Sequence, residues 1–206
     1  MIIWPALVTP LGALTPQPAV AGTTWDSAAK GTNLSLSNAD LDATATSGGF
    51  SSVRATSGKT TGKKYFEILV VTQTGPGEVF AGVSDDATTS TTTLNNFSYA
   101  NTAMTRDDGF SGFSGFTANF STGFGSTVAG KVLGIAVDLD NKKGWIAQDN
   151  TWRSSGDPAG GTNEYFTWSG SYTIYPCISV VTSPTSVRLV PSSTTYSPPS
   201  GFATWD

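Results

Sequence analysis

KVLGIAVDLDNKKGWIAQDNTWRSSGDPAGGT, residues 131–162, is the stretch that decides the fold. In its first ten residues, large apolar side chains alternate with glycine, alanine and aspartate. The alternating apolar residues are Leu133, Ile135, Val137 and Leu139. A period of two is typical of a β-strand with one apolar face, because successive side chains point to opposite sides of the strand. The stretch therefore begins with a strand whose apolar side faces a core.

Turn residues follow this strand and predict a hairpin. Residues 141–144, Asn-Lys-Lys-Gly, supply the turn, since asparagine and glycine adopt a positive φ at low cost. A second strand carries Trp145 and Ile146, and Asp149 with Asn150 makes the next reversal. We expect an antiparallel hairpin over this stretch.

The hairpin segment resembles the SPRY family, in the form found in bacteriophage structural proteins. The resemblance rests on GKVLGIAVDLDNKKGWIAQDNTW at residues 130–152 and on SGDPAGGTNEYFTW, which follows it. Further matches occur in the family's order: GKKYFEILV at 62–70, AGVS at 81–84, YPCISV at 175–180, and YSPPSGFATWD at the end. The resemblance covers residues 25–206. It implies a concanavalin-like jelly roll that recognises its partner through loops at one end of the sandwich.

Composition independently predicts an all-β protein. The chain has 206 residues, enough for one sizeable core, and 23 of them are glycine. No stretch of helical length keeps a 3.6-residue apolar period without glycines that interrupt it. We therefore predict a single antiparallel two-sheet β-sandwich over residues 25–206, preceded by an extended arm over residues 1–24.

Charge and cysteine content exclude several classes of function. The formal net charge is −4 with only 11 lysines and arginines, so the chain lacks the dense basic footprint of a nucleic-acid binder. No run of about 18 apolar residues predicts membrane insertion. Residues 1–14 have no positive charge and are interrupted by Pro5 and Pro10, which disfavours a signal peptide. Cys177 is the one cysteine, so no intrachain disulfide forms, and its apolar strand predicts a buried thiol.

Residues 1–24 form an uncharged arm punctuated by four prolines. Proline fixes φ and removes amide donors, so the arm should run extended. Its large apolar side chains are unfavourable in water. The candidate docking residues among them are Ile2, Ile3, Trp4, Leu7 and Val8. Two alternatives remain: a tail that packs along its own sandwich, and an arm that docks on a second copy or on another virion protein, with Trp4 as its anchor.

Residues 107–127, DDGFSGFSGFTANFSTGFGST, hold five phenylalanines among five glycines. The spacing superficially matches a helix, but each glycine costs up to about 1 kcal/mol in a helix interior. We predict strand–turn–strand structure, with some rings in the core and one or two near the surface. Phe110, Phe113 and Phe116 are therefore candidate ligand-binding residues, since exposed rings can stack on sugars or anchor a protein partner.

Trp152 and Arg153 follow the hairpin and complete the candidate binding site. Trp152 either packs partly against the hairpin or contributes to binding. Arg153 either recognises a carboxylate or an aromatic surface, or remains a solvated loop cation.

The residues that catalysis needs are missing. The chain has no histidine, which removes Ser-His-Asp and Cys-His catalysis and the commonest zinc ligand. Asp138 and Asp140 are the one close-spaced carboxylate pair in a strand, as glycoside hydrolysis would require, but no acidic strand motif of sandwich glycanases accompanies them. Glu67 lies in an apolar strand without a partner carboxylate, which favours a structural role. We predict no enzymatic activity, no cofactor and no metal.

The resemblance, taken with these exclusions, predicts a non-enzymatic structural or binding protein of a phage virion, made in the host cytoplasm. The first candidate role is a tail-fibre or baseplate module, exposed on the particle surface, that binds a host receptor or glycan. A capsid or tail decoration protein docked through its arm is one alternative, and a peptide-binding adaptor is another. The expected partners are virion proteins or a second copy, and host-surface glycan or protein, with no nucleic acid.

Overall fold

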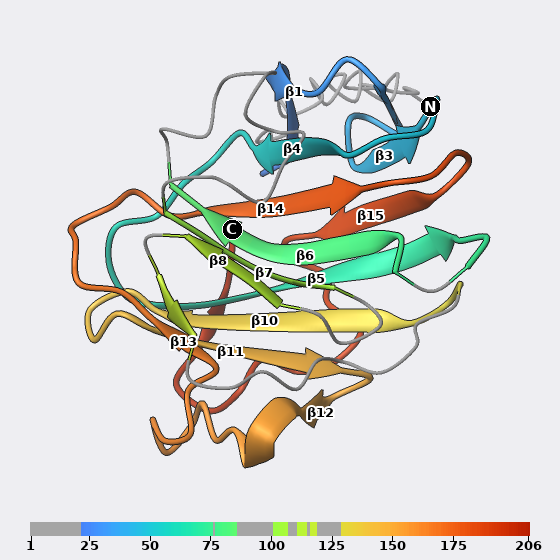
Figure 1. Cartoon of the computed structure of the whole chain (residues 1–206). Helices are drawn as coiled ribbons and strands as arrows, with labels where there is room; N and C mark the ends of the chain where they lie inside the picture. The colour runs from blue at the N-terminus through green and yellow to red at the C-terminus, as the bar shows by residue number, and fades with distance from the viewer. Residues whose placement is uncertain (1–21, 76, 86–100, 107–110, 115, 119–128) are drawn as a thin grey trace, which may run out of the picture.

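Two β-sheets face each other and contain nearly all of the regular secondary structure of the described residues (Figure 1). The computed structural model describes residues 22–75, 77–85, 101–106, 111–114, 116–118 and 129–206. Within these residues the only helix is the 3-10 turn η1 (Arg153–Ser155). The all-β sandwich predicted from the sequence is confirmed.

The first sheet has six strands in the described residues. In spatial order they are β1 (Trp25–Lys30), β4 (Ser51–Ala55), β14 (Tyr175–Val180), β6 (Val79–Ser84), β7 (Thr102–Arg106) and β8 (Ser111–Ser114). All of their pairings are antiparallel.

The second sheet is larger. Its spatial order is β2 (Leu34–Ser37), β3 (Asp42–Ala45), β15 (Ser186–Val190), β5 (Lys63–Thr72), β10 (Val132–Asp138), β11 (Lys143–Gln148), β13 (Phe166–Thr167) and β9 (Thr117–Ala118). Two short strands lie off this path: β12 (Thr151–Trp152), which pairs with β11, and β16 (Ala203–Thr204), which pairs with β5. The β16–β5 pairing is parallel, whereas the other described pairings are antiparallel.

The predicted hairpin is present as β10 and β11. Their register runs from Leu133 opposite Gln148 to Asp138 opposite Lys143. The four alternating apolar residues of this stretch all lie in the main core between the sheets, as predicted. The turn differs in one detail, because the positive φ, 57°, falls on Lys142 and not on the asparagine or glycine of the turn.

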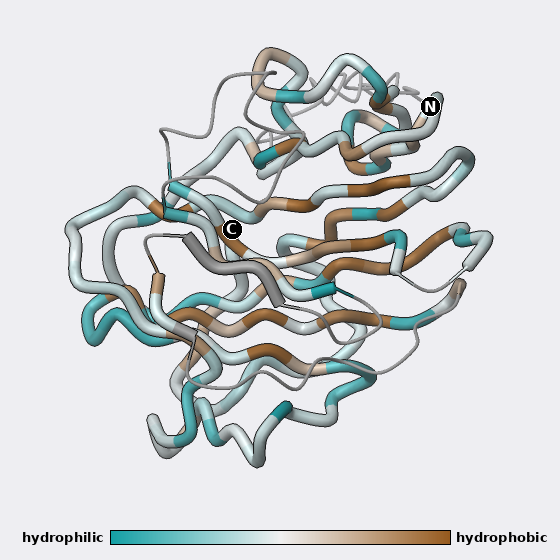
Figure 2. Tube along the Cα trace, in the orientation of Figure 1, coloured by the Kyte–Doolittle hydropathy of each residue, from teal (hydrophilic) through white to brown (hydrophobic). Residues whose placement is uncertain are grey.

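The opposite face of the hairpin is also buried, which the alternation did not predict. Ala136 and Trp145 lie in a second apolar cluster with Tyr65 and Phe202, which come from β5 and from the C-terminal segment. Gly134 is small because a Cβ atom there would lie 2.6 Å from the Tyr65 hydroxyl. The small residues of β10 therefore leave room for rings and do not mark a solvent face. Figure 2 shows apolar residues concentrated along these middle strands.

Glu67 is fully buried in β5, the strand between β15 and β10, and has a structural role. Its carboxylate accepts hydrogen bonds from the Tyr65 hydroxyl at 2.9 Å and from the backbone N–H groups of Thr195 and Tyr196 at 2.6 and 2.8 Å. Burial and the nearby Glu67 raise the pKa of the Tyr65 phenol, so this group stays a donor. The contacts fasten the C-terminal segment to the centre of the sheet.

Several sequence predictions concern residues at the ends of the chain. Residues 1–21, which include the five predicted docking residues, lie outside the described part, and β1 begins at Trp25. Trp205 is fully buried, and its ring contacts Phe66 edge-on at 5.2 Å. Cys177 is buried as predicted. Among the described residues, no helix has the length and apolar character needed to cross a membrane.

Candidate functional site

Three loops lie together at one end of the second sheet. They are residues 56–62 before β5, residues 139–142 between β10 and β11, and residues 168–174 between β13 and β14. The register explains why the first two meet: Lys63 at the start of β5 is opposite Asp138 at the end of β10. Antiparallel neighbours place the entry of one strand beside the exit of the other.

Hydrogen bonds connect the three loops directly. The backbone N–H of Leu139 donates to the carbonyl of Gly62 at 3.0 Å. Lys59 and Ile174 exchange two backbone hydrogen bonds of 2.9 Å. The Lys142 ammonium donates to the Ser169 carbonyl at 2.9 Å. The loops therefore form one assembly held mainly by main-chain groups.

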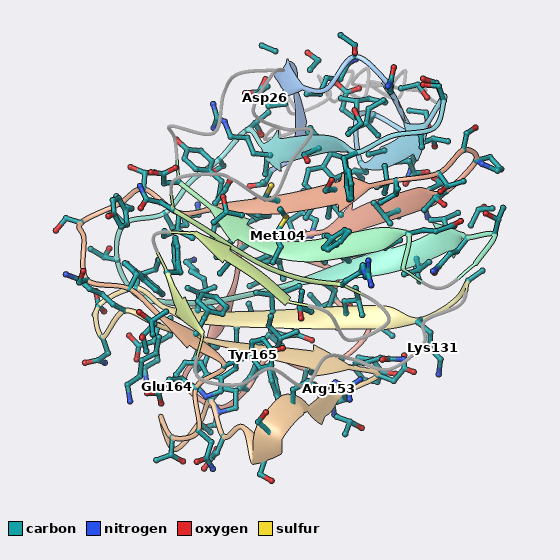
Figure 3. The ribbon with its side chains drawn as sticks, viewed as in Figure 1. Asp26, Met104, Lys131, Arg153, Glu164 and Tyr165 are labelled. Carbon is teal, nitrogen blue, oxygen red and sulfur yellow. The ribbon has the colours of Figure 1, made fainter. Side chains whose placement is uncertain are left out.

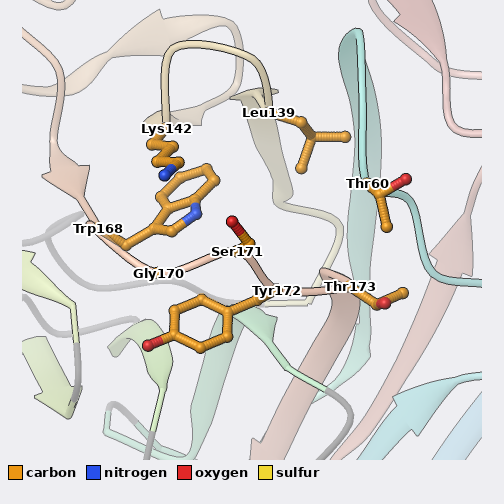
Figure 4. A pocket seen from close by; sticks show the side chains of 8 residues that line it. All are labelled: Thr60, Leu139, Lys142, Trp168, Gly170, Ser171, Tyr172 and Thr173. Atoms are coloured by element: carbon orange, nitrogen blue, oxygen red, sulfur yellow. The ribbon is translucent and has the colours of Figure 1, made fainter.

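A pocket of about 180 Å³ opens between these loops (Figure 4). We call it the Trp168 pocket. The lining residues are Thr60, Leu139, Lys142, Trp168, Gly170, Ser171, Tyr172 and Thr173. In Figure 4 the indole nitrogen of Trp168 and the hydroxyl of Ser171 face the same hollow.

Ring packing behind the pocket fixes its aromatic wall. The Phe116 ring lies 5.3 Å from the Trp168 ring and 6.2 Å from the Tyr172 ring, measured between centroids. Phe166 contacts both Phe116 and Trp168, at 5.8 and 6.1 Å. Because these rings belong to the main core or pack on it, the wall is held in place before any ligand arrives.

Gly170 is needed for the position of Tyr172. A Cβ atom at residue 170 would lie 2.1 Å from Cζ of the Tyr172 ring and 2.3 Å from its hydroxyl. Any larger residue would displace this ring. The local sequence Trp-Ser-Gly-Ser-Tyr, residues 168–172, therefore sets the shape of the pocket.

The polar groups of the pocket are hydroxyls, an indole N–H and an ammonium. None of the described lining residues is acidic. Lys142 has one carbonyl partner, Ser169, and an ammonium has three donor hydrogens. This composition suits a ligand that is rich in acceptor oxygens.

The nearby carboxylates have structural partners. Asp138 is 2% exposed and accepts from the backbone N–H of Asn141 at 3.0 Å and from its side-chain amide at 2.9 Å, with Lys63 at 3.5 Å. Burial opposes ionisation of Asp138, but these hydrogen bonds and Lys63 outweigh it and hold its pKa below the ordinary value. Asp140 accepts from the backbone N–H of Gly62 at 3.1 Å. Asp138 therefore stabilises the turn between β10 and β11, and Asp140 joins this turn to the loop before β5. No group of three or more potential metal ligands occurs among the residues that the structure describes.

The phenylalanines predicted to bind a ligand have different positions. Phe110 lies outside the described residues. Phe113 is opposite Ala103 in the β7–β8 pairing, and its side chain is likewise outside the description. Phe116 is 7% exposed and supports the Trp168 pocket from behind without lining it. Their predicted role in binding stays a prediction.

Trp152 and Arg153 lie at β12 and η1, and neither lines the Trp168 pocket. Trp152 packs against the second apolar cluster, with its ring 6.3 Å from that of Tyr65. Arg153, labelled in Figure 3, donates to the Gln148 side chain at 3.0 Å. Burial lowers the pKa of its guanidinium. The partly buried alternative for Trp152 matches its observed position, and binding by either residue stays a prediction.

Sequence reasoning did not find the Trp168 pocket. Trp168 and Tyr172 were visible as aromatic residues around a Ser-Gly-Ser turn, a signal that indicates rings on a tight scaffold. Lys142 and Thr60 carry no such signal, because only the strand register brings their loops to the same place.

The sequence matches no protein-family model and no curated protein, whereas the structure resembles solved SPRY domains. The SPRY domain of human HERC1 gives a TM-score of 0.61 with 16% identity, over 81% of this chain and 96% of that chain. Another human SPRY domain gives a TM-score of 0.58 with 12% identity, over 82% of this chain and 97% of that chain. The PSpry domain of TRIM65 gives a TM-score of 0.55 with 14% identity, over 82% of this chain and 92% of that chain. The chain therefore has the SPRY fold; at these identities the likeness shows the fold alone.

Proposed function

We propose that the chain is a non-enzymatic binding module displayed on a phage particle, and that the Trp168 pocket receives one sugar residue of a host-surface glycan. The observation that carries this proposal is the pocket itself, with an aromatic wall held from behind and hydroxyl, indole and ammonium donors at its rim. Sugars present an apolar ring face and many acceptor oxygens, which match these two features.

The size of the pocket favours a single residue of a longer ligand. Pockets for drug-sized molecules are usually about 300–1,000 Å³, and the Trp168 pocket is about 180 Å³. A glycan would place one ring there and extend over the surrounding loops. The affinity of one such site is expected to be modest, and repeated copies on a particle would raise it by multivalency.

Binding without catalysis is supported by the chemistry of the lining. Among the residues that the structure describes, no lining residue is a carboxylic acid, histidine or cysteine. Asp138 and Asp140 beside the pocket already accept hydrogen bonds from Asn141 and Gly62. General acid–base catalysis of glycoside hydrolysis requires two carboxyl groups around the scissile bond. The bound saccharide should therefore remain intact.

The proposed location on a phage particle rests on the sequence resemblance to phage structural proteins, which involves several segments in the same order along the chain. The SPRY fold is compatible with this location. A decoration protein attached to the capsid or tail through residues 1–24 is the second candidate. The uncharged, apolar composition of that arm favours it. Immunogold electron microscopy of the particle distinguishes the two, since a receptor-binding module labels the tail tip and a decoration protein labels the capsid or tail surface.

Two matched substitutions test the glycan site. Lys142 and Lys30 each donate to one backbone carbonyl, Ser169 at 2.9 Å and Leu34 at 2.8 Å, but only Lys142 lines the pocket. Lys142→Met should weaken binding to host-surface polysaccharide about tenfold, because a charge-assisted hydrogen bond contributes roughly 1.5–3 kcal/mol. Lys30→Met should bind like the wild type.

The measurement is titration calorimetry or a glycan array with the full chain. Mass spectrometry of the saccharide afterwards checks that no bond is cleaved. Absence of saccharide binding by the wild type, or equal loss in both variants, would remove the glycan proposal. Cleavage that requires Asp138 or Asp140 would overturn the non-enzymatic assignment.

A further inference from the structure

A second hollow, larger than the Trp168 pocket, lies where the described chain begins and ends. Its volume is about 720 Å³, and we call it the Leu41 groove. Its lining combines the residues just before β1, the turn before β3, the end of β15 with the residues after it, and the last residue. The lining residues are Gly22, Thr23, Thr24, Ala39, Leu41, Thr56, Arg188, Leu189, Val190, Pro191, Ser192, Ser193 and Asp206.

Residues 22–24, which precede β1, lie in the wall of this groove. Thr23 donates to the Asp206 carboxylate with its backbone N–H, at 3.0 Å, and with its hydroxyl. A Cβ atom at Gly22 would lie 2.9 Å from the same carboxylate, so the backbone there passes close to Asp206. The described part of the chain therefore begins in the groove wall.

The charged groups of the groove already have partners. Arg188 donates to both carboxylate oxygens of Asp42, at 2.6 and 2.8 Å. Asp206 accepts from Thr23. The remaining wall is mainly Leu41, Leu189, Val190 and Pro191 together with small hydroxyl residues. Such a surface favours an apolar, uncharged occupant.

Residues 1–24 of this chain have that composition, because they contain no charged side chain. Leu14 and Val20 are the large apolar residues nearest to Gly22, and Pro16 and Pro18 favour an extended backbone between them. An extended backbone loses less conformational entropy when it docks. At about 3.3 Å per residue, residues 14–21 can reach roughly 26 Å.

We propose that residues 14–21 continue from Gly22 into the Leu41 groove of the same chain, with Val20 and Leu14 as anchors. Direct tethering gives this segment an effective concentration in the millimolar range, which favours it over a second copy or a separate partner. Residues 2–8 then lie beyond the docked part and keep their predicted role in contacting another protein. The proposal does not depend on glycan binding by the Trp168 pocket.

One test compares identical substitutions within the arm of the full chain. Val20→Asp places a charge in the groove, and Val8→Asp places the same charge outside it. We expect Val20→Asp to lower Tm by about 3 °C or more and Val8→Asp to leave it unchanged in the isolated protein. Val20→Ala should give a smaller loss in the same direction. Equal Tm values for the two aspartate variants would overturn the proposal.

A second test locates the segment directly by disulfide crosslinking. Cys177 is fully buried and burial raises the pKa of its thiol to about 12, so it does not compete. The pair Val20→Cys with Leu41→Cys should form an intrachain disulfide under mild oxidation, and Val8→Cys with Leu41→Cys should not. A crosslinked dimer from the first pair would assign the groove to a second copy, and no crosslink at all would leave the segment outside it; either result overturns the proposal.

Discussion

The Trp168 pocket and the Leu41 groove belong to the same sandwich but are held together in different ways. Main-chain hydrogen bonds between neighbouring loops and ring packing from the core hold the pocket. Carboxylates hold the groove: Asp206 fixes Thr23, Asp42 fixes Arg188, and Glu67 fixes the segment after Ser193. These contacts join pairs of residues that are separated by 128 to 183 positions in the chain.

This difference suggests different occupants. The pocket is small, rimmed with donors and preformed, which suits an external ligand that must be recognised by its acceptors. The groove is larger and apolar, and its shape depends on the contact between Thr23, just before β1, and Asp206, the last residue. Such a surface suits a segment of the same chain that is always present, because an exposed apolar hollow would otherwise promote aggregation.

The largest expected effect is that of Glu67→Ala, which should damage the groove far more than the pocket. Removal of this buried carboxylate leaves the N–H groups of Thr195 and Tyr196 and the hydroxyl of Tyr65 without their acceptor. Each buried unsatisfied group costs about 1–3 kcal/mol, so the free energy of unfolding should fall by about 3 kcal/mol or more. Urea denaturation measures this loss.

Glu164→Ala is the matched control for that measurement. Glu164 pairs with Lys143 at 3.3 Å near the surface, and exposed ion pairs contribute about 0–1 kcal/mol. If Glu67→Ala were no more destabilising than Glu164→Ala, the carboxylate contacts would not be what holds the C-terminal segment and the groove wall.

A smaller effect is expected from Asp138→Asn, which acts on the pocket through the turn at residues 139–142. The variant keeps an acceptor for the Asn141 backbone but loses the charge that pairs with Lys63. The free energy of unfolding should fall by about 1 kcal/mol at neutral pH. Saccharide binding should weaken with it, since Leu139 and Lys142 line the pocket.

The pH dependence of stability gives this prediction a sign. The pKa of Asp138 is lowered in the folded state, so its stabilising contribution is complete above the ordinary value of 3.8 and is lost as the pH falls below it. The difference in stability between the wild type and Asp138→Asn should therefore shrink below pH 3.8. A difference that stays constant from pH 7 to pH 2.5 would show that the Asp138 charge does not stabilise the turn.

The sequence predicted those parts of the fold that local patterns determine. Alternation in residues 133–139 predicted the β10–β11 hairpin, and the apolar strand expected around Glu67 is present as β5. Glu67 was correctly expected to be structural. In each case the signal lies within about ten consecutive residues, where side-chain periodicity reports burial directly.

Contacts between distant segments could not be predicted in this way. The small residues Gly134 and Ala136 suggested a second, unburied face, but Phe202, nearly 70 positions later, covers that side. Likewise, Thr60, Lys142 and Trp168 form one pocket only because the β5–β10 register and the β13–β14 connection bring three loops together. No spacing within the sequence encodes such an arrangement.

The smallest expected effect on stability, and the sharpest test of the pocket, is Gly170→Ala. The added methyl group would overlap the Tyr172 ring, whose half-buried position lets it swing outward. The free energy of unfolding should change by less than about 1 kcal/mol, whereas saccharide affinity should fall about tenfold because one aromatic wall is displaced. Gly48→Ala is the control, since no atom lies within 4 Å of a Cβ atom at that position. If Gly170→Ala binds saccharide as tightly as Gly48→Ala, Tyr172 does not shape the ligand site. The Trp168 pocket would then not be the preformed ligand site that distinguishes it from the Leu41 groove.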